Sequence, residues 1–555
     1  MTKTKSNFIF GTIVLVLTNL LTKVIGAIYR IPLLKILGSD GLGEYQIILP
    51  IYALFLVVSS SGIVVTMSKF ISHETVSKNT HNSKKILLAG ILLAFVTSVL
   101  LSVILIFVSP VLVKYQHIGS GNLAYFAMVP AIIFGSMLSV FRGYFLGKKQ
   151  MIYSGISQVF EAGGKLVFGL VLSAQFVKWG FLNAILGALL GISISEMFAF
   201  AFSVILYFAT KRKQANKSFV FLKNKNVKIF KTTKKSKTIY FSKNRYLTLK
   251  KAVKKVFSFS VFITLQACVM PLVGALDSII IVPLLLKLGI IEPVAYSMFG
   301  IETGVVSSIL ALPTVISIAV GSSIIPNINK KTAKEQTEQN IKNAFNIVWL
   351  TTLFCAFVFA LFSKEIILFL YGGGMSNVMF DELMLSSNLL KVNGINIVYL
   401  CLLSLSTSVL QGLEKNKAPV VNLSIAATGR FILIFVLLSV DGVNIYGTAI
   451  ADAAFYALAL ILNLREIKKE VALNFGISKF FVLPVLSCCA VSMSMKLMQF
   501  LLADFFSQRV FTLLVMIFGL VAYLAFLSAT KVLKIKDMLN VFIKRNSKNN
   551  IYQKR

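Results

Sequence analysis

The sequence predicts an all-α polytopic membrane protein with about 14 transmembrane helices. We expect two six-helix lobes related by pseudo-two-fold symmetry around a central cavity, plus two C-terminal helices. First, 57% of the 555 residues are hydrophobic and the mean hydropathy is +0.84, which excludes an ordinary soluble domain. Second, apolar runs of about 20 residues, long enough to cross the hydrocarbon core, recur along most of the chain. Third, short residue patterns recur in both halves, as a duplication predicts.

The first apolar run begins at Phe8, after a basic start with Lys3 and Lys5. It is longer than the apolar region of a signal peptide and lacks a small-residue cleavage site, so we expect a retained first span. Thirteen further runs follow, separated by polar or charged loops. The predicted spans are 8–29, 45–67, 86–108, 122–141, 154–176, 181–209, 257–286, 294–325, 344–370, 388–410, 418–439, 443–464, 478–502 and 510–533.

The formal net charge of +36 comes mostly from loops, and lysine and arginine gather in every second loop. The basic loops carry Lys69, Lys78, Lys84, Lys85, Arg142, Lys148, Lys149, Lys330, Lys331, Lys334, Lys342, Lys415, Lys417, Arg465, Lys468 and Lys469. The opposite loops are poor by comparison: the loops between spans 3 and 4, 5 and 6, and 13 and 14 carry Lys114, Lys178 and Arg509, and the loop between spans 11 and 12 carries no lysine or arginine. Because cytoplasmic loops carry an excess of lysine and arginine, this alternation predicts that both termini are cytoplasmic.

The longest break between spans, 210–256, holds seventeen Lys and Arg residues and no Asp or Glu. We expect a cytoplasmic linker that lies on the anionic membrane lipids. A basic run also suits nucleic acid, but no recognition module accompanies this one, so we expect no nucleic-acid partner. The predicted organisation is an N-lobe 1–209, the linker 210–256, a C-lobe 257–464, two further spans in 465–533 and a basic cytoplasmic tail 534–555.

Two patterns recur in the same order in both lobes. At an offset of 251 residues, Pro32, Leu33, Leu34, Leu37, Gly38 and Tyr45 recur as Pro283, Leu284, Leu285, Leu288, Gly289 and Tyr296. Gly143, Lys148 and Gly164-Lys165 are echoed by Gly412, Lys417 and Gly429-Arg430. With six spans in each copy, the repeats are parallel, an architecture in which rocking of the lobes alternates access to a cavity between them.

Two cations lie in or near the first span. A cation near the bilayer centre costs about 2.5–3.5 kcal/mol, so Lys23 predicts a wet cavity, an acidic partner or an anionic ligand. Arg30 follows seven residues later, two turns along nearly the same helix face. It is either a second cavity cation or an interfacial anchor.

A second set of charges lies in the fifth spans of the two lobes. Glu161 precedes Lys165 by four residues, the favoured order for a helical ion pair. This pair is either structural or opens when a substrate binds. Arg430 corresponds to Lys165 in the repeat but has no acidic residue four positions earlier; it either faces the bundle or extends to the interface.

Two carboxylates lie in the first two spans of the C-lobe. Asp277 follows Pro271 by six residues, where a loosened backbone can line a cavity. It is either a cation-coupling carboxylate or a partner for a lysine. Glu302 begins a stretch rich in hydroxyl groups, which indicates a cavity wall. In the N-terminal half the intramembrane cations match or outnumber the carboxylates, which favours an anionic substrate such as a phosphate.

The sequence offers little material for catalysis or metal binding. The five cysteines all lie in apolar segments without CxxC spacing, and the three histidines lie in loops. We therefore expect no disulfide framework, no metal site and no enzyme activity.

The opening stretch also carries a family resemblance. Its residues are Gly11-Thr12, Lys23-Val24-Ile25-Gly26, Arg30-Ile31-Pro32, Gly38, Gly43, Tyr45-Gln46, Pro50, Ser59-Ser60-Ser61-Gly62 and Ser68-Lys69, joined later by Leu312-Pro313 and Ile324-Ile325-Pro326. This pattern resembles the polysaccharide biosynthesis/stage V sporulation protein B group of the multidrug/oligosaccharidyl-lipid/polysaccharide exporter superfamily, which also contains the lipid II flippases. The resemblance covers nearly the whole chain and is strongest over 8–72.

The resemblance implies a monomeric flippase of the bacterial plasma membrane. Its substrate would be an undecaprenyl-pyrophosphate-linked saccharide, lipid II or a related envelope precursor, moved from the inner to the outer leaflet. Substrate contacts are expected from Lys23, Arg30, Lys165, Glu302 and Arg430, although Arg30 is displaced by one position and the basic residue expected beside Glu302 is missing. The driving force is either the membrane potential or a coupled sodium ion or proton, with Asp277 as the coupling carboxylate; no other cofactor is expected.

Two other functions remain open at this point. A multidrug/toxin extrusion antiporter of the same superfamily would carry acidic cavity residues, where this sequence has Lys23. A membrane glycosyltransferase or polysaccharide ligase would need a loop with clustered carboxylates or histidines. The longest outer loop, 371–387, has only Asp381 and Glu382.

Overall fold

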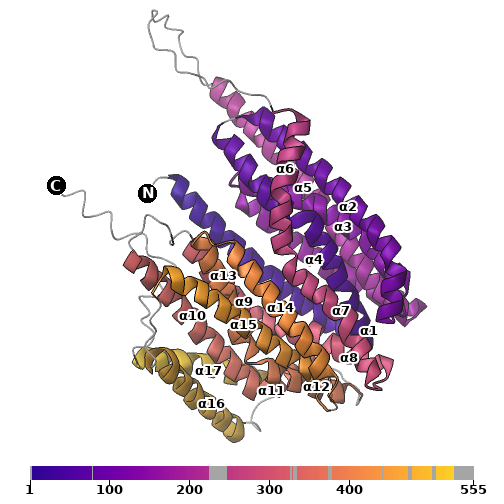
Figure 1. Cartoon of the computed structure of the whole chain (residues 1–555), viewed down its shortest axis with the longest axis vertical. Coiled ribbons are helices and arrows are strands. Elements are labelled where there is room, and N and C mark those ends of the chain that lie inside the picture. Colours follow the sequence, from indigo (N-terminus) through magenta and orange to yellow (C-terminus); the bar gives the residue numbers. More distant parts are fainter. Residues whose placement is uncertain are drawn as a thin grey trace, which may run out of the picture. The chain divides into compact units, whose positions relative to one another are not determined.

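The computed structural model describes residues 3–77, 79–223, 247–325, 328, 334–372, 378–440, 442–472, 478–502 and 508–530. All regular secondary structure within these ranges is helical (Figure 1). The middle of the predicted basic linker, 224–246, and the predicted tail 534–555 lie outside the described residues, whereas helices occupy both ends of that linker, up to Lys223 and from Leu249.

The longest helix, α1 (Lys3–Val76), contains both of the first two predicted spans. It is kinked at Gly38, whose φ of 67° and ψ of −179° are not helical. This left-handed φ favours glycine because glycine has no Cβ. The kink divides α1 into two helical segments, each long enough to cross a membrane.

Five helical elements follow α1, and the last of them extends into the predicted basic linker. They are α2 (Thr80–Gln116), α3 (Asn122–Gly147), α4 (Met151–Phe176), η1 (Val177–Trp179) and α5 (Phe181–Lys223). Helix α5 packs against both α3 and α4 (Figure 1). At the α4–α5 contact a Cβ on Gly191 would lie 2.4 Å from the Cα of Gly169, so the two backbones touch.

From residue 247 the chain continues with further helices and two π-helical segments. The first are α6 (Leu249–Ala267), α7 (Val269–Lys287), α8 (Glu292–Gly300), η2 (Ile301–Val306), α9 (Ser307–Ile324), α10 (Lys334–Leu361) and α11 (Ser363–Tyr371). The rest are α12 (Val378–Asn393), α13 (Asn396–Gly412), α14 (Lys417–Leu438), α15 (Tyr446–Glu470), η4 (Ser478–Val482), α16 (Leu483–Leu502) and α17 (Gln508–Ala529).

The described residues form two compact units. The first unit comprises Met1–Ile25 and Ile48–Ala275, and the second comprises Gly26–Ile47 and Leu276–Arg555. Helix α1 therefore contributes to both. Within the first unit the second half of α1 packs against α6, where Ser260 donates to the Thr66 hydroxyl at 3.0 Å. Within the second unit Gly43 of α1 packs against the backbone of Tyr296 in α8.

The described helices accommodate the predicted spans. Twelve of the described helices are long and apolar enough to cross a membrane. Helices α12 and α13, which meet at a bend of 50°, together make one further candidate. The apolar part of α1, Val14–Val76, has 63 residues, whereas one crossing needs about 20. Because α1 thus holds two spans, about fourteen crossings fit the chain, as predicted.

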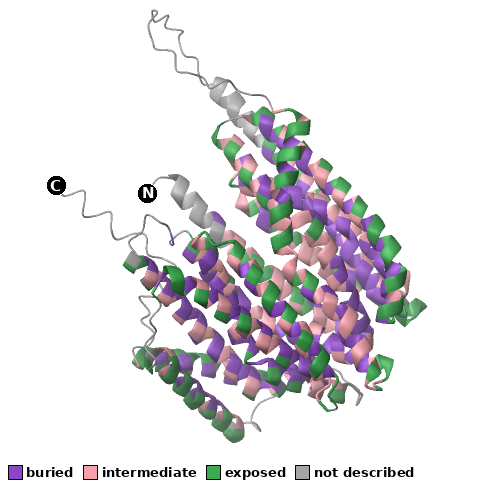
Figure 2. Cartoon of the chain, in the orientation of Figure 1, coloured by how far each residue is buried: buried purple, intermediate pink, exposed green. Residues whose placement is uncertain are grey.

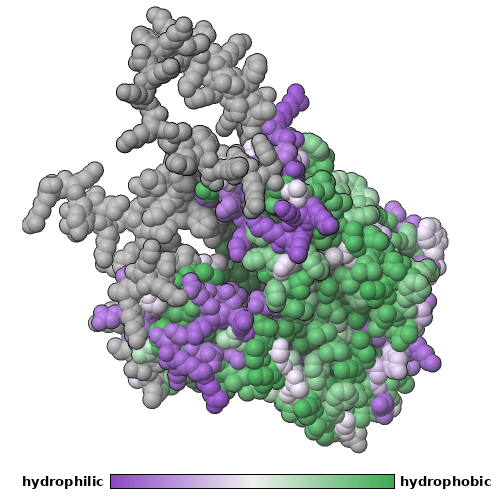
Figure 3. Space-filling model, turned by 45° about the horizontal axis from the view of Figure 1, so that its top comes forward, coloured by the Kyte–Doolittle hydropathy of each residue, from purple (hydrophilic) through white to green (hydrophobic). Residues whose placement is uncertain are grey.

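Large apolar side chains are exposed on the outer faces of many helices. Phe107 on α2 is 77% exposed and Phe500 on α16 is 84% exposed. Exposed and buried residues alternate around the helices in Figure 2, and hydrophobic residues cover much of the face seen in Figure 3. An exposed apolar surface of this extent is stable only in contact with lipid or another apolar partner, as expected for a multi-pass membrane protein.

Candidate functional site

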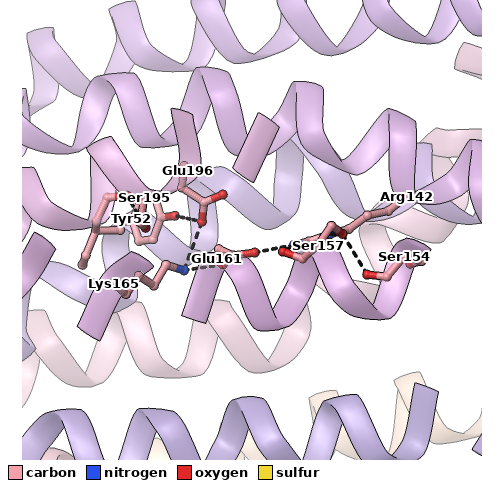
Figure 4. A network of polar contacts seen from close by, with 9 residues as sticks. Tyr52, Arg142, Ser154, Ser157, Glu161, Lys165, Ser195 and Glu196 are labelled. Atoms are coloured by element: carbon pink, nitrogen blue, oxygen red, sulfur yellow. Dashed lines mark hydrogen bonds and ion pairs between the residues drawn. The ribbon is translucent and has the colours of Figure 1, made fainter. Parts of the chain in front are cut away.

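A buried cluster of charges in the first unit joins α3, α4 and α5 (Figure 4). Glu161 of α4 forms an ion pair with Lys165, one turn further along the same helix. Its other carboxylate oxygen, Oε2, lies 2.6 Å from Nη2 of Arg142 on α3. Lys165 Nζ also lies 3.0 Å from Oε1 of Glu196 on α5. The pair predicted from the spacing of Glu161 and Lys165 is therefore part of a larger network.

Neighbouring polar groups hold this first cluster in place. Glu196 is only 2% exposed and accepts a hydrogen bond from the Tyr52 hydroxyl at 3.3 Å. Arg142 donates to the Ser157 hydroxyl at 3.0 Å and to the Ser157 carbonyl at 3.1 Å. Two cations thus face two carboxylates, so the cluster is formally neutral. Buried charges persist when they are paired and hydrogen-bonded in this way.

Arg142 is also a correction to the loop assignment. We predicted it in the loop that follows the span 122–141, whereas α3 continues to Gly147 and contains it. Its side chain is only 18% exposed and points into the ion-pair network (Figure 4). The sequence did contain a signal for this residue. Glu161 and Glu196 are two carboxylates within spans, and Lys165 alone supplies only one positive charge, so a second cation was needed.

A second buried cluster lies in the second unit and is centred on Arg430 of α14. Its Nη1 lies 2.5 Å from Oδ1 of Asp277 on α7, and its Nε lies 2.5 Å from Oδ1 of Asp452 on α15. The Arg430 side chain is 5% exposed, so it faces the bundle and does not extend to the interface. Of the two roles left open for Asp277, the structure shows a basic partner, although that partner is an arginine.

Glu302 lies beside the second cluster on the π-helical segment η2. It is 7% exposed. One carboxylate oxygen, Oε1, accepts a hydrogen bond from the Thr448 hydroxyl of α15, one turn before Asp452. The other oxygen, Oε2, is buried and has no hydrogen-bond partner among the described residues. π-Helical turns inside α-helices occur frequently at functional sites.

The two cations of α1 belong to different units. Arg30, in the second unit, donates through Nη1 to the Gly304 carbonyl at 2.8 Å and to the Ser308 hydroxyl, with a longer contact of 3.4 Å to the Thr303 carbonyl. These acceptors lie on η2 and the first turn of α9. Lys23, in the first unit, is half-buried. The structure thus brings Arg30 to the polar stretch that begins at Glu302.

The two clusters share one arrangement. In each half, a cation on the helix of the fifth predicted span pairs with a carboxylate on the next span: Lys165 with Glu196, and Arg430 with Asp452. The repeated Gly-Lys and Gly-Arg pairs predicted the first member of each pair but not the second. Glu196 and Asp452 can be recognised in the sequence as charges within spans, but no local pattern assigns them as partners, because packing sets the distance between residues on different helices.

Residues 8–331 match the family described as polysaccharide biosynthesis protein. The chain belongs to this family. Stage V sporulation protein B of Bacillus subtilis (strain 168) is 22% identical over 484 residues, covering 86% of each chain. The lipid II flippase MurJ of the same organism is 23% identical over 519 residues, covering 91% of this chain and 90% of the relative.

Solved structures show the same fold for this polysaccharide biosynthesis family member. The structure titled lipid II flippase MurJ, inward closed conformation, matches 95% of this chain and 100% of its own with a TM-score of 0.67 and 14% identity. An inward-facing multidrug resistance MATE family transporter of the MOP superfamily matches 80% of this chain and 94% of its own, with a TM-score of 0.59 and 12% identity. The chain is thus a multi-pass membrane transport protein of this family, whose named relatives include flippases and not enzymes.

Proposed function

We propose that this protein is a flippase that moves an undecaprenyl-pyrophosphate-linked saccharide from the inner to the outer leaflet of the bacterial plasma membrane by alternating access. The observation that carries this proposal is the alignment with a lipid II flippase over 91% of the chain. It is combined with two cations, Lys23 and Arg30, in the apolar helix α1. The proposed substrate is a class of molecules: lipid-linked saccharides that serve as precursors of the cell envelope.

The geometry of Arg30 supports a role in binding the pyrophosphate. Its contacts to Gly304 and Ser308 use Nη1 alone. Nε and Nη2 have no hydrogen-bond partner among the described residues and are not among the fully buried polar atoms. A guanidinium held at one nitrogen and open at the other two presents the fork that binds phosphate oxygens in a bidentate manner. Lys23 supplies a second positive charge on the same helix.

The experiment is a complementation test in a strain depleted of its own flippase. Lys23→Ala and Arg30→Ala are expected to insert at normal levels but to abolish rescue. The lipid-linked precursor is then expected to accumulate on the inner leaflet, as measured by leaflet-specific labelling. Lys114→Ala is the matched control, because Lys114 is an exposed lysine near the end of another apolar helix, α2. Full rescue by both α1 variants would remove the pyrophosphate assignment.

A second candidate function is a multidrug extrusion antiporter, favoured by the fold shared with a MATE family transporter at a TM-score of 0.59. The two functions separate in one assay. An antiporter raises the resistance of its host to cationic drugs without rescuing the flippase-depleted strain, and a flippase does the reverse.

We also propose that both termini are cytoplasmic and that the protein acts as a monomer. The orientation of the termini follows from the alternation of loop cations, and the monomer follows from the family resemblance. Reporter fusions at each end test the orientation, and the mass of the protein in detergent micelles tests the monomer. A dimer in micelles contradicts the monomer. Activity at either terminus of a reporter that works only on the extracytoplasmic side contradicts the proposed orientation.

A further inference from the structure

The two buried clusters differ in their charge balance. In the first unit, Arg142 and Lys165 match Glu161 and Glu196 one to one. In the second unit the single guanidinium of Arg430 is already shared by Asp277 and Asp452. Glu302 is therefore a third carboxylate beside one cation. The second cluster, in the part of the chain that the structure describes, lacks the positive charge that would balance it.

Glu302 carries this imbalance at a single atom. Thr448 satisfies Oε1, but Oε2 is fully buried and unpartnered, and no described ion pair includes Glu302. Nε2 of Gln46 on α1 is likewise buried without a hydrogen-bond partner in the part of the chain that the structure describes. A Cβ on Gly304 would lie 3.2 Å from this Gln46 nitrogen, which places the amide next to η2. An ionised carboxylate buried without a cation is so unfavourable that such a group becomes neutral instead.

The other titratable groups near η2 are engaged elsewhere. The charges that act on Glu302 are Asp452, Arg430 and Asp277, with Tyr456 also nearby on α15.

The titratable groups on the other elements around η2 have other partners. Arg30 of α1 donates to backbone carbonyls, Glu382 of α12 accepts from Ser39, and Glu292 of α8 accepts from Tyr296. Glu44 of α1 faces Tyr296, and α9 contains no charged residue. None of these groups forms an ion pair with Glu302 within the described residues.

We propose that Glu302 is a proton-binding site that couples transport to the movement of a proton. The inference rests on the proposed transport function and names its energy source. Oε2 carries the proton while η2 is closed against α1 and α15, and Oε1 remains the acceptor for Thr448. When the transport cycle opens this region to water, the carboxyl releases the proton. A group that binds its proton in only one of two conformations links the proton to the equilibrium between them.

The coupling carboxylate is then Glu302 and not Asp277. Arg430 already occupies the position between Asp277 and Asp452 that a coupling cation would take, and it is tethered to α14. Asp277 is thus the partner of a fixed cation, whereas Oε2 of Glu302 has no partner among the residues that the structure describes.

The test is infrared spectroscopy of the full-length protein in liposomes, which records the carbonyl band of protonated carboxylic acids. At neutral pH we expect such a band in the native protein and its loss in Glu302→Gln. The matched control is Glu161→Gln, which removes a buried carboxylate from the neutral cluster and is expected to leave the band unchanged. Persistence of the full band in Glu302→Gln overturns the proposal, as does a native protein without the band.

A second variant keeps the test decisive if Glu302→Gln does not fold. Thr448→Val retains Glu302 but removes the hydroxyl that donates to its carbonyl oxygen, so the band is expected to shift to higher frequency. No shift overturns the assignment to Glu302. Loss of the band on addition of sodium chloride at constant pH also overturns it, because a metal cation would then have replaced the proton.

Coupling itself is tested in the flippase-depleted strain. Glu302→Gln is expected to insert and to lose rescue, because its amide cannot release a proton. Full rescue at both mildly acidic and mildly alkaline pH overturns coupling even if the band is lost. Because the spectroscopic result needs no substrate, failure of the proposed flippase function in the Lys23 and Arg30 variants is distinguishable from failure of the proton site.

Discussion

Lys165 Nζ and Glu196 Oε1 lie 3.0 Å apart and join α4 to α5, and Arg430 joins α14 to α15 through Asp452 in the other half. In both halves a cation thus ties the fifth predicted span to the sixth. A lysine or arginine within a membrane span is stable when it faces a carboxylate in the bundle. The ion pairs therefore stabilise the contact between the two helices that they join. A carboxylate that is matched by a cation has a structural role, whereas one without a matching cation is available for another role.

Replacement of Arg430 by methionine should strongly destabilise the protein. The variant leaves Asp277 and Asp452 buried without the guanidinium that lies 2.5 Å from each. Removal of one partner from a buried ion pair typically costs about 3–5 kcal/mol. Chemical unfolding in mixed micelles measures the loss. The triple variant Arg430→Met, Asp277→Asn and Asp452→Asn should recover most of it, and failure to recover would contradict the ion-pair explanation. Lys469→Ala, which removes an exposed pair with Glu466, is the control and should have no measurable effect.

Glu161 and Glu302, which lie in the two charge clusters, should respond differently to neutralisation. Glu161→Gln removes the partner of Lys165 and Arg142 and should lower the free energy of unfolding by about 3–5 kcal/mol. Glu302→Gln replaces a group that we infer to be neutral, so its free energy of unfolding should change little. Equal losses in the two variants would indicate that Glu302 is ionised.

Gly43 should not tolerate even alanine. A Cβ at this position would lie 1.9 Å from the Tyr296 carbonyl oxygen, which belongs to the backbone of α8 and cannot move aside as a flexible side chain can. Gly43→Ala should therefore separate α1 from α8 and lower the thermal unfolding temperature. The control lies on the same helix: a Cβ on Gly26 would meet no atom within 4 Å. Gly26→Ala should be neutral or stabilising by about 0.5–1 kcal/mol, since alanine favours helix. A tolerated Gly43→Ala would contradict the close contact.

Ser308 should matter less than the arginine that it contacts. Ser308→Ala removes one hydrogen-bond acceptor of Arg30 but leaves the Gly304 carbonyl. The expected loss of stability is about 1 kcal/mol, with rescue of the depleted strain retained, whereas Arg30→Ala abolishes rescue. If Ser308→Ala alone abolished rescue, the hydroxyl would contact the substrate directly.

Several parts of the site were predictable because they depend on local sequence. The pair of Glu161 and Lys165 follows from a spacing of four residues on one helix. The repeat predicted Arg430 as the counterpart of Lys165. By contrast, Arg142 was placed in a loop because the apolar run of its span ends before the helix does.

The sequence by itself determined that this chain is a helical membrane protein of about fourteen spans with cations in its first span, because hydropathy and loop charge act along the chain. Only the tertiary structure decided which charges meet. It paired Asp277 with Arg430, gave Lys165 a second carboxylate in Glu196, and left Oε2 of Glu302 without a partner among the described residues. The physical reason is that these partners lie on different helices, whose rotation and closeness are set by packing, including close approaches such as Gly169 to Gly191.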